Sequence, residues 1–339
     1  MDARAWLLAQ WFGPGSGVAH LLLRPLAALY RVLERWTRRR RQAQAAARAQ
    51  PACPVVVIGN LVVGGAGKTP TTIAIVQALQ AAGRRPGVVS RGYGRQDRLP
   101  RSVGADSSAA QVGDEPLLIH RRTGVPVMVE RDRVQAAQRL LAQHPQVDVI
   151  VADDGLQHRQ LRRDVEVVVF DERGVGNGQL LPAGPLREPM QAAPGPNALV
   201  LYNHARATTA WPGFIAQRRL TGAWPLAEWL AGQPARNLDT LRGRPLLALA
   251  GIAVPERFFA GLRQQGLAIV PCPQADHQAY DSAPWPAGTT EVVTTEKDAV
   301  KLQRWASGDV SVWVVGLDLE LPADFVAALL QRLPSAPPP

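Results

Sequence analysis

The residues best suited to chemistry in this 339-residue sequence lie in a short glycine-rich loop that reads GGAGKT at positions 64–69. A β-branched apolar run, Val55–Ile58, comes before the loop, and an apolar-periodic helix is expected after it. In such a strand, loop and helix, the backbone N–H groups of the loop bind phosphate oxygens at the positive end of the helix dipole. Lys68 would reach the outer phosphates and the hydroxyl of Thr69 would bind Mg²⁺. The pattern therefore predicts a nucleotide-binding site.

The spacing of this loop departs from the usual P-loop, which has a glycine six positions before the lysine. That position is Val62 here, and the tighter GGxGKT form remains. This form resembles the variant P-loop of ATPases that have a second lysine just before the glycine pair, where this sequence has Val63. We expect the nucleotide to bind along Val62, Val63, Gly64, Gly65, Ala66, Gly67, Lys68 and Thr69.

A P-loop protein also needs an acidic residue at the end of a second buried strand to complete the coordination of Mg²⁺. The segment VDVIVADD at 147–154 supplies Asp153 and Asp154 directly after an apolar run. Two adjacent carboxylates at a strand end are costly unless a cation binds there, which favours a metal site. The alternative is an ordinary strand exit, because Asp and Gly are common turn residues.

Further polar clusters fall on predicted loops. They are SRGYGR (90–95), VGDEP (112–116), ERDR (130–133), DDGLQH (153–158), GNGQLLPAGPLREP (176–189), ADHQAY (275–280) and TTEKD (294–298). Taken singly, each could be a capping loop or a solvated turn.

Apolar strands alternate with amphipathic helices through residue 205, which predicts a parallel sheet covered on both faces. Strands are expected at 55–58, 87–90, 125–129, 147–152, 165–170 and 198–202, and in a second set at 246–250, 268–270, 292–294 and 312–315. The predicted fold class is α/β, with a P-loop NTPase-like parallel-sheet domain, a second, smaller α/β domain and an N-terminal amphipathic helical segment. The expected boundaries are 1–50 for the basic segment, 51–205 for the nucleotide-binding domain, 206–242 for a linker and 243–335 for a C-terminal domain that closes over the active site.

Positive charge is concentrated near the start of the sequence. Residues 1–50 hold nine arginines and two acidic residues, a net charge of +7 out of the chain's +10. Arg24 and Pro25 interrupt the apolar-periodic stretch 18–36, so a membrane-spanning helix and a secretory signal are both disfavoured. We expect an amphipathic helix on an anionic membrane surface, with arginines on the headgroups. The alternative is a helix packed on its own domain, with Arg38–Arg41 in a solvated turn.

Taken in order with the glycine loop, the clusters resemble the tetraacyldisaccharide 4′-kinase family, the lipid A 4′-kinases of Gram-negative bacteria. The shared motifs are GNLVVGGAGKTP, SRGYGR, GDEP, DDGLQH, LLPAGPLREP, DH and TTEKD, together with the basic amphipathic start. The resemblance implies transfer of the γ-phosphoryl group of ATP to the 4′-hydroxyl of an acylated glucosamine disaccharide 1-phosphate, with Mg²⁺. It also implies a peripheral or monotopic location at the cytoplasmic face of the bacterial inner membrane.

The resemblance assigns a catalytic aspartate to the GDEP motif, which makes Asp114 the expected base for the sugar hydroxyl. A hydrogen bond to a histidine can orient a carboxylate and share its proton, and the resemblance nominates His277 of the DH pair as that partner. His277 would reach Asp114 from the second domain, so domain closure would assemble the dyad. The alternative for His277 is a plain turn residue.

Other polar residues are candidates for substrate binding. Arg133 and Arg187, the latter beside Glu188, are expected to bind the 1-phosphate or to stabilise developing charge, because one guanidinium group can donate two hydrogen bonds to phosphate oxygens. Tyr93 could cover the adenine ring or stack on a sugar, and a half-buried loop tyrosine is the alternative. His158 could orient a loop, and Glu296–Asp298 could serve either the nucleotide or a helix N-terminus.

Two other classes of protein remain to be separated from a kinase. A nucleotide-switched binding ATPase has a similar variant P-loop but would not need Asp114 or His277. A nucleic-acid-binding role is not expected, because no base-reading module accompanies the arginines. The two distant cysteines, Cys53 and Cys272, match neither a disulfide framework nor a four-ligand zinc site.

Overall fold

A computed structural model describes residues 3–13 and 18–334 of the chain. These residues form two compact units. The first unit is Met1–Arg91, Val125–Gln217 and Glu320–Pro339, and the second is Gly92–Gly124 and Arg218–Leu319, each taken within the described residues. The chain therefore passes from the first unit to the second and back twice.

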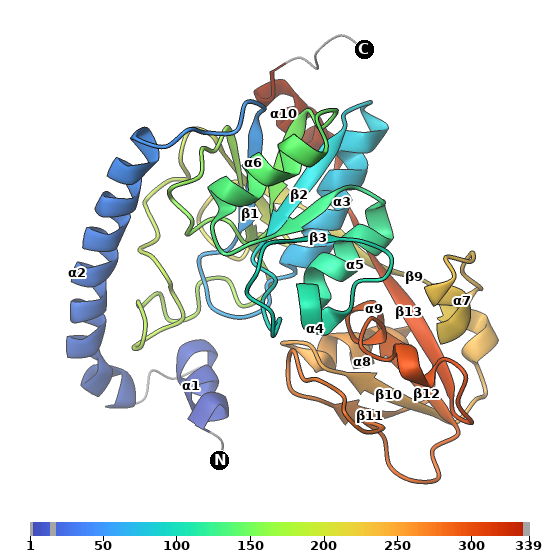
Figure 1. The fold of residues 1–339 in the computed structure, drawn as a ribbon. Helices are drawn as coiled ribbons and strands as arrows, with labels where there is room; N and C mark the ends of the chain where they lie inside the picture. Colours follow the sequence, from blue (N-terminus) through green and yellow to red (C-terminus); the bar gives the residue numbers. More distant parts are fainter. Residues whose placement is uncertain (1–2, 14–17, 335–339) are drawn as a thin grey trace. The chain divides into compact units, whose positions relative to one another are not determined.

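A parallel β-sheet forms the centre of the first unit (Figure 1). Within the first unit, the strands of this sheet follow the order β4-β2-β5-β1-β6-β7-β8. Their bounds are β1 (Val55–Gly59), β2 (Pro86–Ser90), β4 (Val127–Val129), β5 (Val149–Ala152), β6 (Val165–Phe170), β7 (Ala198–Tyr202) and β8 (Phe214–Ile215). Because these strands pair in parallel, their carboxyl ends meet at one edge, where sheets of this kind bind ligands.

Helices bury the faces of this sheet, which explains the continuous apolar runs of its strands. Ala137 and Leu140 of α6 (Arg133–Gln143) pack with Val55, Val57 and Ile150 of the central strands. Helix α3 (Lys68–Ala81) contacts β1 and β2, and α10 (Ala323–Arg332) contacts α3 and β7. The six strands expected from the sequence in this region are all present, with ends within two residues of the expected ones.

Two helices, α1 (Ala3–Phe12) and α2 (Val18–Ala46), precede the sheet in the first unit (Figure 1). Trp11 Nε1 donates to the carbonyl oxygen of Pro182 at 3.0 Å, and the hydroxyl of Tyr30 donates to that of Arg187 at 2.8 Å. Six large apolar side chains of α2 are nevertheless 53–74% exposed, namely Leu22, Leu26, Leu29, Val32, Leu33 and Trp36; we call them the α2 apolar stripe. Helix α2 thus both packs on its own unit and presents an apolar surface.

Arg38–Arg41, placed in a turn by the alternative interpretation, are helical residues of α2. Across the described part of the chain, no helix is long and apolar enough to cross a bilayer.

A second sheet, with the strand order β11-β10-β12-β13-β9, forms the centre of the second unit. Its strands are β9 (Gln217–Pro225), β10 (Leu246–Ala250), β11 (Ile269–Pro273), β12 (Glu291–Thr295) and β13 (Ser311–Glu320). The unit also contains β3 (Arg101–Val103), α4 (Ala109–Val112), α5 (Asp114–Thr123), α7 (Leu226–Leu230), α8 (Pro255–Gln264), α9 (Glu296–Ala299) and the 3-10 turns η1 (Leu238–Leu241) and η2 (Gln303–Trp305). Phe259, Leu262, Val293 and Trp313 lie in its core.

These units divide the chain differently from the boundaries expected from the sequence. Residues 92–124 were expected in the nucleotide-binding domain and belong to the second unit, whereas α10 was expected in the C-terminal domain and belongs to the first. The expected linker, 206–242, contains β8, β9, α7 and η1. Strand periodicity does not reveal that 92–124 belongs to the second unit, because β2 and β4, the strands that this segment joins, are neighbours in the first sheet.

Candidate functional site

The glycine loop, residues 62–69, connects β1 to α3 at the carboxyl edge of the first sheet. Gly64 and Gly67 have φ angles of +93° and +81°, a left-handed conformation that glycine adopts without steric cost. Two asparagine side chains hold the loop through its carbonyl groups. Asn60 Nδ2 donates to the carbonyl oxygen of Gly64 at 3.3 Å, and Asn203 Nδ2 donates to the carbonyl oxygen of Ala66 at 3.0 Å. Such a braced, glycine-rich turn before a helix is the usual form of a phosphate-binding loop.

Lys68 is the first residue of α3 and the cation of this loop. Its Nζ lies 3.3 Å from Asn60 Oδ1 and 3.7 Å from Asp154 Oδ1. The second distance is longer than a hydrogen bond, so the ammonium group is held near the loop without being fixed to one carboxylate. A phosphate group, with more negative charge, can therefore attract it.

Asp153 and Asp154 lie directly after β5, at the edge where the sequence predicted them. Asp153 is 1% exposed, and its carboxylate accepts hydrogen bonds from Thr72 Oγ1 at 2.9 Å and Ser90 Oγ at 3.2 Å. Burial would raise the pKa of Asp154, but the positive charges of Lys68, Arg187 and Arg133 outweigh it and hold that pKa below its usual value. Asp154 is therefore anionic at neutral pH.

The donor chemistry of these residues fits Mg²⁺. Asp153, Asp154 and Thr69 offer oxygen atoms, the type of ligand that Mg²⁺ prefers, and the ion usually binds to proteins through one or two carboxylates together with substrate phosphates. The hydrogen bonds from Thr72 and Ser90 hold the carboxylate of Asp153 in place.

Arg187 and Glu188 belong to one polar network beside Asp154. Arg187 Nη1 donates to Asp154 Oδ1 at 3.3 Å and to Gln157 Oε1 at 3.0 Å. The buried carboxylate of Glu188 accepts from Gln157 Nε2 at 3.1 Å and from Arg159. Arg187 thus lies among the predicted site residues, while Glu188 holds the groups around it.

Arg133 is buried and faces backbone carbonyl groups. Its Nη1 donates to the carbonyl oxygen of Glu130 at 2.9 Å and its Nη2 donates to that of Asp153 at 3.3 Å. The backbone N–H of Arg133 donates to His158 Nε2 at 3.3 Å. Burial and the charge of Arg133 lower the pKa of His158 to about 4, so His158 is a neutral acceptor at the start of α6.

Asp114 and His277 lie together within the second unit. The Nδ1 atom of His277 lies 3.1 Å from Oδ1 and 3.0 Å from Oδ2 of Asp114. Asp114 is buried, with 4% of its surface exposed. The expectation that they come from different domains is wrong, because the GDEP segment belongs to the same unit as His277. The pair is thus formed without any movement of one unit.

Lys297 completes this arrangement, which we call the Asp114 cluster. Its Nζ lies 3.2 Å from His277 Nε2, 3.0 Å from Asp276 Oδ1 and 3.2 Å from Glu115 Oε1. An ammonium group only donates hydrogen bonds, so Nε2 is the acceptor and Nδ1 carries the proton that His277 donates to Asp114. Lys297 therefore favours the tautomer of His277 in which Nδ1 carries the proton.

Neighbouring charges keep both Asp114 and Lys297 ionised, the two residues that contact His277 from opposite sides. Burial would raise the pKa of Asp114, but the hydrogen bond from His277 and the charge of Lys297 outweigh it and lower that pKa. Burial would lower the pKa of Lys297, but the carboxylates of Glu115, Asp114 and Asp276 raise it above its usual value. Asp114 is therefore a carboxylate at neutral pH and Lys297 an ammonium.

Tyr93 lies against the same histidine. Its ring meets that of His277 edge to face at 4.8 Å between centroids, and the residue is 63% exposed. The neighbouring Gly94 has a φ of +80°, and a Cβ there would lie 3.9 Å from that of His277. An exposed aromatic ring beside a polar cluster is a surface on which a base or a sugar can stack.

Several residues of these sites were not singled out from the sequence. Asn60 and Asn203 support the glycine loop, and Thr72 and Ser90 hold Asp153. Asn60 follows β1 and Asn203 follows β7. A polar residue directly after a buried strand was therefore the feature of the sequence that could have identified these two asparagines. Lys297 was considered only within Glu296–Asp298, for the nucleotide or a helix N-terminus, since nothing in the sequence brings it to His277.

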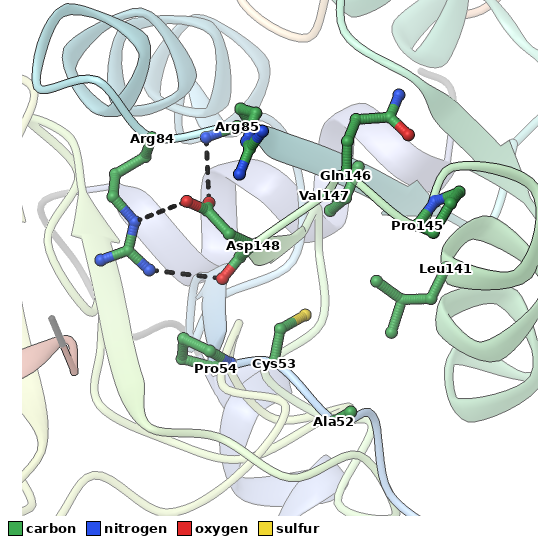
Figure 2. Close-up of a pocket in the computed structure, with 10 residues that line it drawn as sticks. All are labelled: Ala52, Cys53, Pro54, Arg84, Arg85, Leu141, Pro145, Gln146, Val147 and Asp148. Atoms are coloured by element: carbon green, nitrogen blue, oxygen red, sulfur yellow. Dashed lines mark hydrogen bonds and ion pairs between the residues drawn. The ribbon is translucent and has the colours of Figure 1, made fainter. Parts of the chain in front are cut away.

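One cavity of the first unit lies away from all of these residues. It has a volume of about 430 Å³ and is lined at the amino ends of β1, β2 and β5 by residues that include Cys53, Arg84, Arg85 and Asp148. Figure 2 shows Asp148 accepting hydrogen bonds from Arg84 and from the backbone of Arg85. Arg84 also donates to the carbonyl oxygen of Pro334 at 2.8 Å. The cavity contains none of the predicted site residues.

The parallel sheet, the strand–loop–helix with its GGAGKT sequence and the acidic residues after β5 define a P-loop α/β protein. The family model described as tetraacyldisaccharide-1-P 4′-kinase matches residues 19–334. The chain belongs to this family.

Proteins with curated names agree with this assignment. The chain is 54% identical over 329 residues to the tetraacyldisaccharide 4′-kinase of Leptothrix cholodnii, which covers 95% of this chain and 94% of that protein. It is 53% identical over 332 residues to the one from Methylibium petroleiphilum, covering 96% and 92%. The fold resembles the crystal structure of the "apo" form of LpxK from Aquifex aeolicus in complex with ATP, with a TM-score of 0.74 and 24% identity, over 93% of this chain and 100% of that one.

Proposed function

We propose that this protein transfers the γ-phosphoryl group of ATP to the 4′-hydroxyl of a tetraacyldisaccharide 1-phosphate, a step of lipid A biosynthesis. The observation on which the proposal rests is the Asp114 cluster, because a nucleotide-switched ATPase has no need of a buried carboxylate bound to a histidine of fixed tautomer. Family membership indicates the acylated disaccharide as the acceptor, and the glycine loop supplies the nucleotide site.

The glycine loop binds the triphosphate of ATP in this proposal. Its backbone N–H groups and the N-terminus of α3 face the phosphates, and Lys68 moves from its loose pair with Asp154 to the outer phosphate. Asp153, Asp154 and Thr69 would hold Mg²⁺, which neutralises phosphate charge during the transfer. The structural role of the asparagines is to keep the loop in its binding conformation before ATP arrives.

Asp114 is the general base that takes the proton of the sugar hydroxyl. An isolated carboxylate is a weak base for an alcohol, but phosphoryl transfer has a loose transition state in which the hydroxyl proton leaves late. His277 orients the carboxylate through Nδ1–H and stabilises its charge, and Lys297 holds His277 from the other side. The base is therefore positioned before the substrate binds.

The remaining predicted residues would bind the acylated disaccharide 1-phosphate. Arg187 contacts Asp154 through one nitrogen atom and remains close to the glycine loop, so it is the stronger candidate for a phosphate contact. Arg133 is buried against carbonyl oxygens and supports the end of β5, with Glu188 supporting the network beside Arg187. Tyr93 offers an exposed ring for the sugar or the adenine.

The acyl chains require a membrane, and α2 supplies a surface for one. The α2 apolar stripe enters the interface, and the arginines of the same helix lie at the anionic headgroups. A peripheral location on the cytoplasmic face of the inner membrane follows from this, since ATP is supplied there. Nucleic acid is not a partner in the proposal.

The experiment is a transfer of radiolabel from [γ-³²P]ATP to a lipid-extractable product. We expect label in the lipid only when the acylated disaccharide 1-phosphate is present, and ATP turnover that depends on that acceptor. ATP turnover at the same rate without acceptor, with no label in the lipid, would instead identify a nucleotide-switched ATPase.

A further inference from the structure

Arg173 lies next to the glycine loop, in a segment whose sequence motif, DERG, has no role in the mechanism above. The segment follows β6, and Asp171 at its start has a fully buried side chain. Arg173 Nη2 is 2.7 Å and its Nε 2.9 Å from Asp171 Oδ2. This two-point pair fixes the plane of the guanidinium group.

The same guanidinium reaches the glycine loop itself. Nη2 donates to the carbonyl oxygen of Gly65 at 2.9 Å. Nη1 would lie 3.3 Å from a Cβ atom placed on Gly64, so it covers the side of the loop that a side chain at Gly64 would fill. Among the hydrogen bonds of the described residues, Arg173 donates through Nε and Nη2 and not through Nη1, and its side chain is only 15% exposed. The two N–H groups of Nη1 can therefore donate to a ligand at the phosphate-binding loop.

The other side of the guanidinium is covered by the N-terminal helix α1. The ring of Phe12 lies 5.0 Å from the guanidinium carbon of Arg173, a cation–π contact. Trp11 anchors this end of α1 through Pro182, and its carbonyl oxygen accepts from the backbone N–H of Asn177 at 2.8 Å. At Gly176 a Cβ would lie 2.5 Å from the carbonyl oxygen of Trp11, so only glycine permits α1 to approach this closely.

We propose that Arg173 is a further catalytic residue, whose Nη1 group contacts an outer phosphate oxygen of ATP, and that Phe12 positions it. The proposal rests on the function proposed above. In phosphoryl transfer, an arginine that donates to the transferred group stabilises charge that develops in the transition state. The N-terminal segment is then part of the catalytic apparatus as well as a membrane contact, because α1 completes the surroundings of an arginine at the nucleotide.

The test compares Arg173→Ala and Arg173→Lys with the full-length wild-type chain. We expect kcat for label transfer to fall by about 10²–10³-fold in both variants, the usual cost of losing one donor to developing charge. Lysine does not rescue activity because it cannot pair with Asp171, bind the loop and reach a phosphate at once. The dissociation constant of ATP, measured by calorimetry, should change less than about fivefold, since the loop's backbone donors remain.

A role limited to bracing the loop gives a different result. ATP affinity and melting temperature would then fall together with kcat in Arg173→Ala, and that outcome overturns the proposal, as does a kcat equal to that of wild type. If the wild-type chain itself labels no lipid, the proposed function fails, which is distinguishable from a failure confined to the arginine variants.

Phe12→Ala tests the positioning part, with Trp6→Ala as the matched control because Trp6 is a partly exposed aromatic residue of the same helix. The assay uses substrate dispersed in detergent micelles, where docking on a bilayer is not required. We expect kcat to fall about five- to tenfold in Phe12→Ala, the loss of one desolvated cation–π contact, and to stay at the wild-type value in Trp6→Ala. Equal kcat values for both variants would show that α1 does not position Arg173.

Discussion

The glycine loop and the Asp114 cluster are built in opposite ways. Near the loop, the three cations Lys68, Arg173 and Arg187 balance the carboxylate of Asp171, which pairs with Arg173, and those of Asp153 and Asp154, which an Mg²⁺ ion can share. The Asp114 cluster has three carboxylates, those of Asp114, Glu115 and Asp276, against the single ammonium of Lys297. One region suits the binding of phosphate, and the other repels phosphate and attracts a proton.

This difference indicates a division of labour between the units. In the proposed function, the first unit supplies the binding energy for ATP and the second unit activates the sugar hydroxyl. If the division is correct, variants in one region should change one kinetic quantity and leave the other nearly unchanged, because no residue of the Asp114 cluster belongs to the glycine loop.

The largest effects are expected from the central residue of each region. Asp114→Asn should lower kcat by about 10²–10⁴-fold, the usual contribution of a general base, with the dissociation constant of ATP within about twofold of wild type. Lys68→Met should weaken ATP binding and turnover together. Calorimetry with ATP and steady-state kinetics measure the two quantities, and a parallel loss of ATP affinity in Asp114→Asn would break the division.

Lys297→Met should have the next largest effect, lowering kcat by about 10–100-fold while KM for ATP stays the same, because His277 loses its fixed tautomer. Lys297→Arg keeps the charge and should recover part of the activity. The charge of Lys297 lowers the pKa of Asp114, so its removal raises that pKa, and the acid limb of kcat/KM should move to higher pH. An unchanged pH profile alongside a lower melting temperature would leave Lys297 with a structural role alone.

The α2 apolar stripe should affect membrane partition more modestly. Leu26→Asp combined with Leu33→Asp should lower partition into vesicles with anionic lipid by about tenfold, since apolar area is replaced by charge of the wrong sign. ATP binding should be unchanged. Leu99→Asp, which alters a leucine that is exposed in the second unit, serves as the control, and equal partition of both variants would remove the membrane role of α2.

The smallest effect should come from His158→Gln, which leaves both regions intact. The pKa of His158 is about 4 in the folded chain and about 6.5 when unfolded, so the unfolded state binds the proton first. Wild-type stability is therefore full above pH 6.5 and falls as the pH drops towards 4. We expect the free energy of unfolding, measured with denaturant, to change by about 2 kcal/mol less between pH 7 and pH 5 in the variant than in the wild-type chain. An equal change in both chains would refute the assignment.

The strands and the glycine loop could be predicted from the sequence because the information they need is local. Val55–Ile58 must be buried on both sides, and GGAGKT needs only its own backbone and the next helix. The division into units was not predictable, because residues 92–124 join β2 to β4, two neighbouring strands of the first sheet, and so look like an ordinary connection.

The Asp114 cluster was predicted only in part. The family resemblance named Asp114 and His277, but the contact of Lys297 with Nε2 depends on α9 lying beside α5, which is a matter of tertiary packing. Arg173 was missed for the same reason: its role depends on the loop after β6 and on Phe12, more than 150 residues earlier in the chain. Side chains whose partners are distant in sequence leave no periodic signal.

The most direct test of the proposed base is a single-turnover experiment with Asp114→Asn saturated with [γ-³²P]ATP before the acylated disaccharide 1-phosphate is added by rapid mixing. If Asp114 takes the proton of the hydroxyl, ATP remains bound and intact, and label enters the lipid at least about 10²-fold more slowly than with the wild-type chain. Label entering the lipid at the wild-type rate would contradict the central claim.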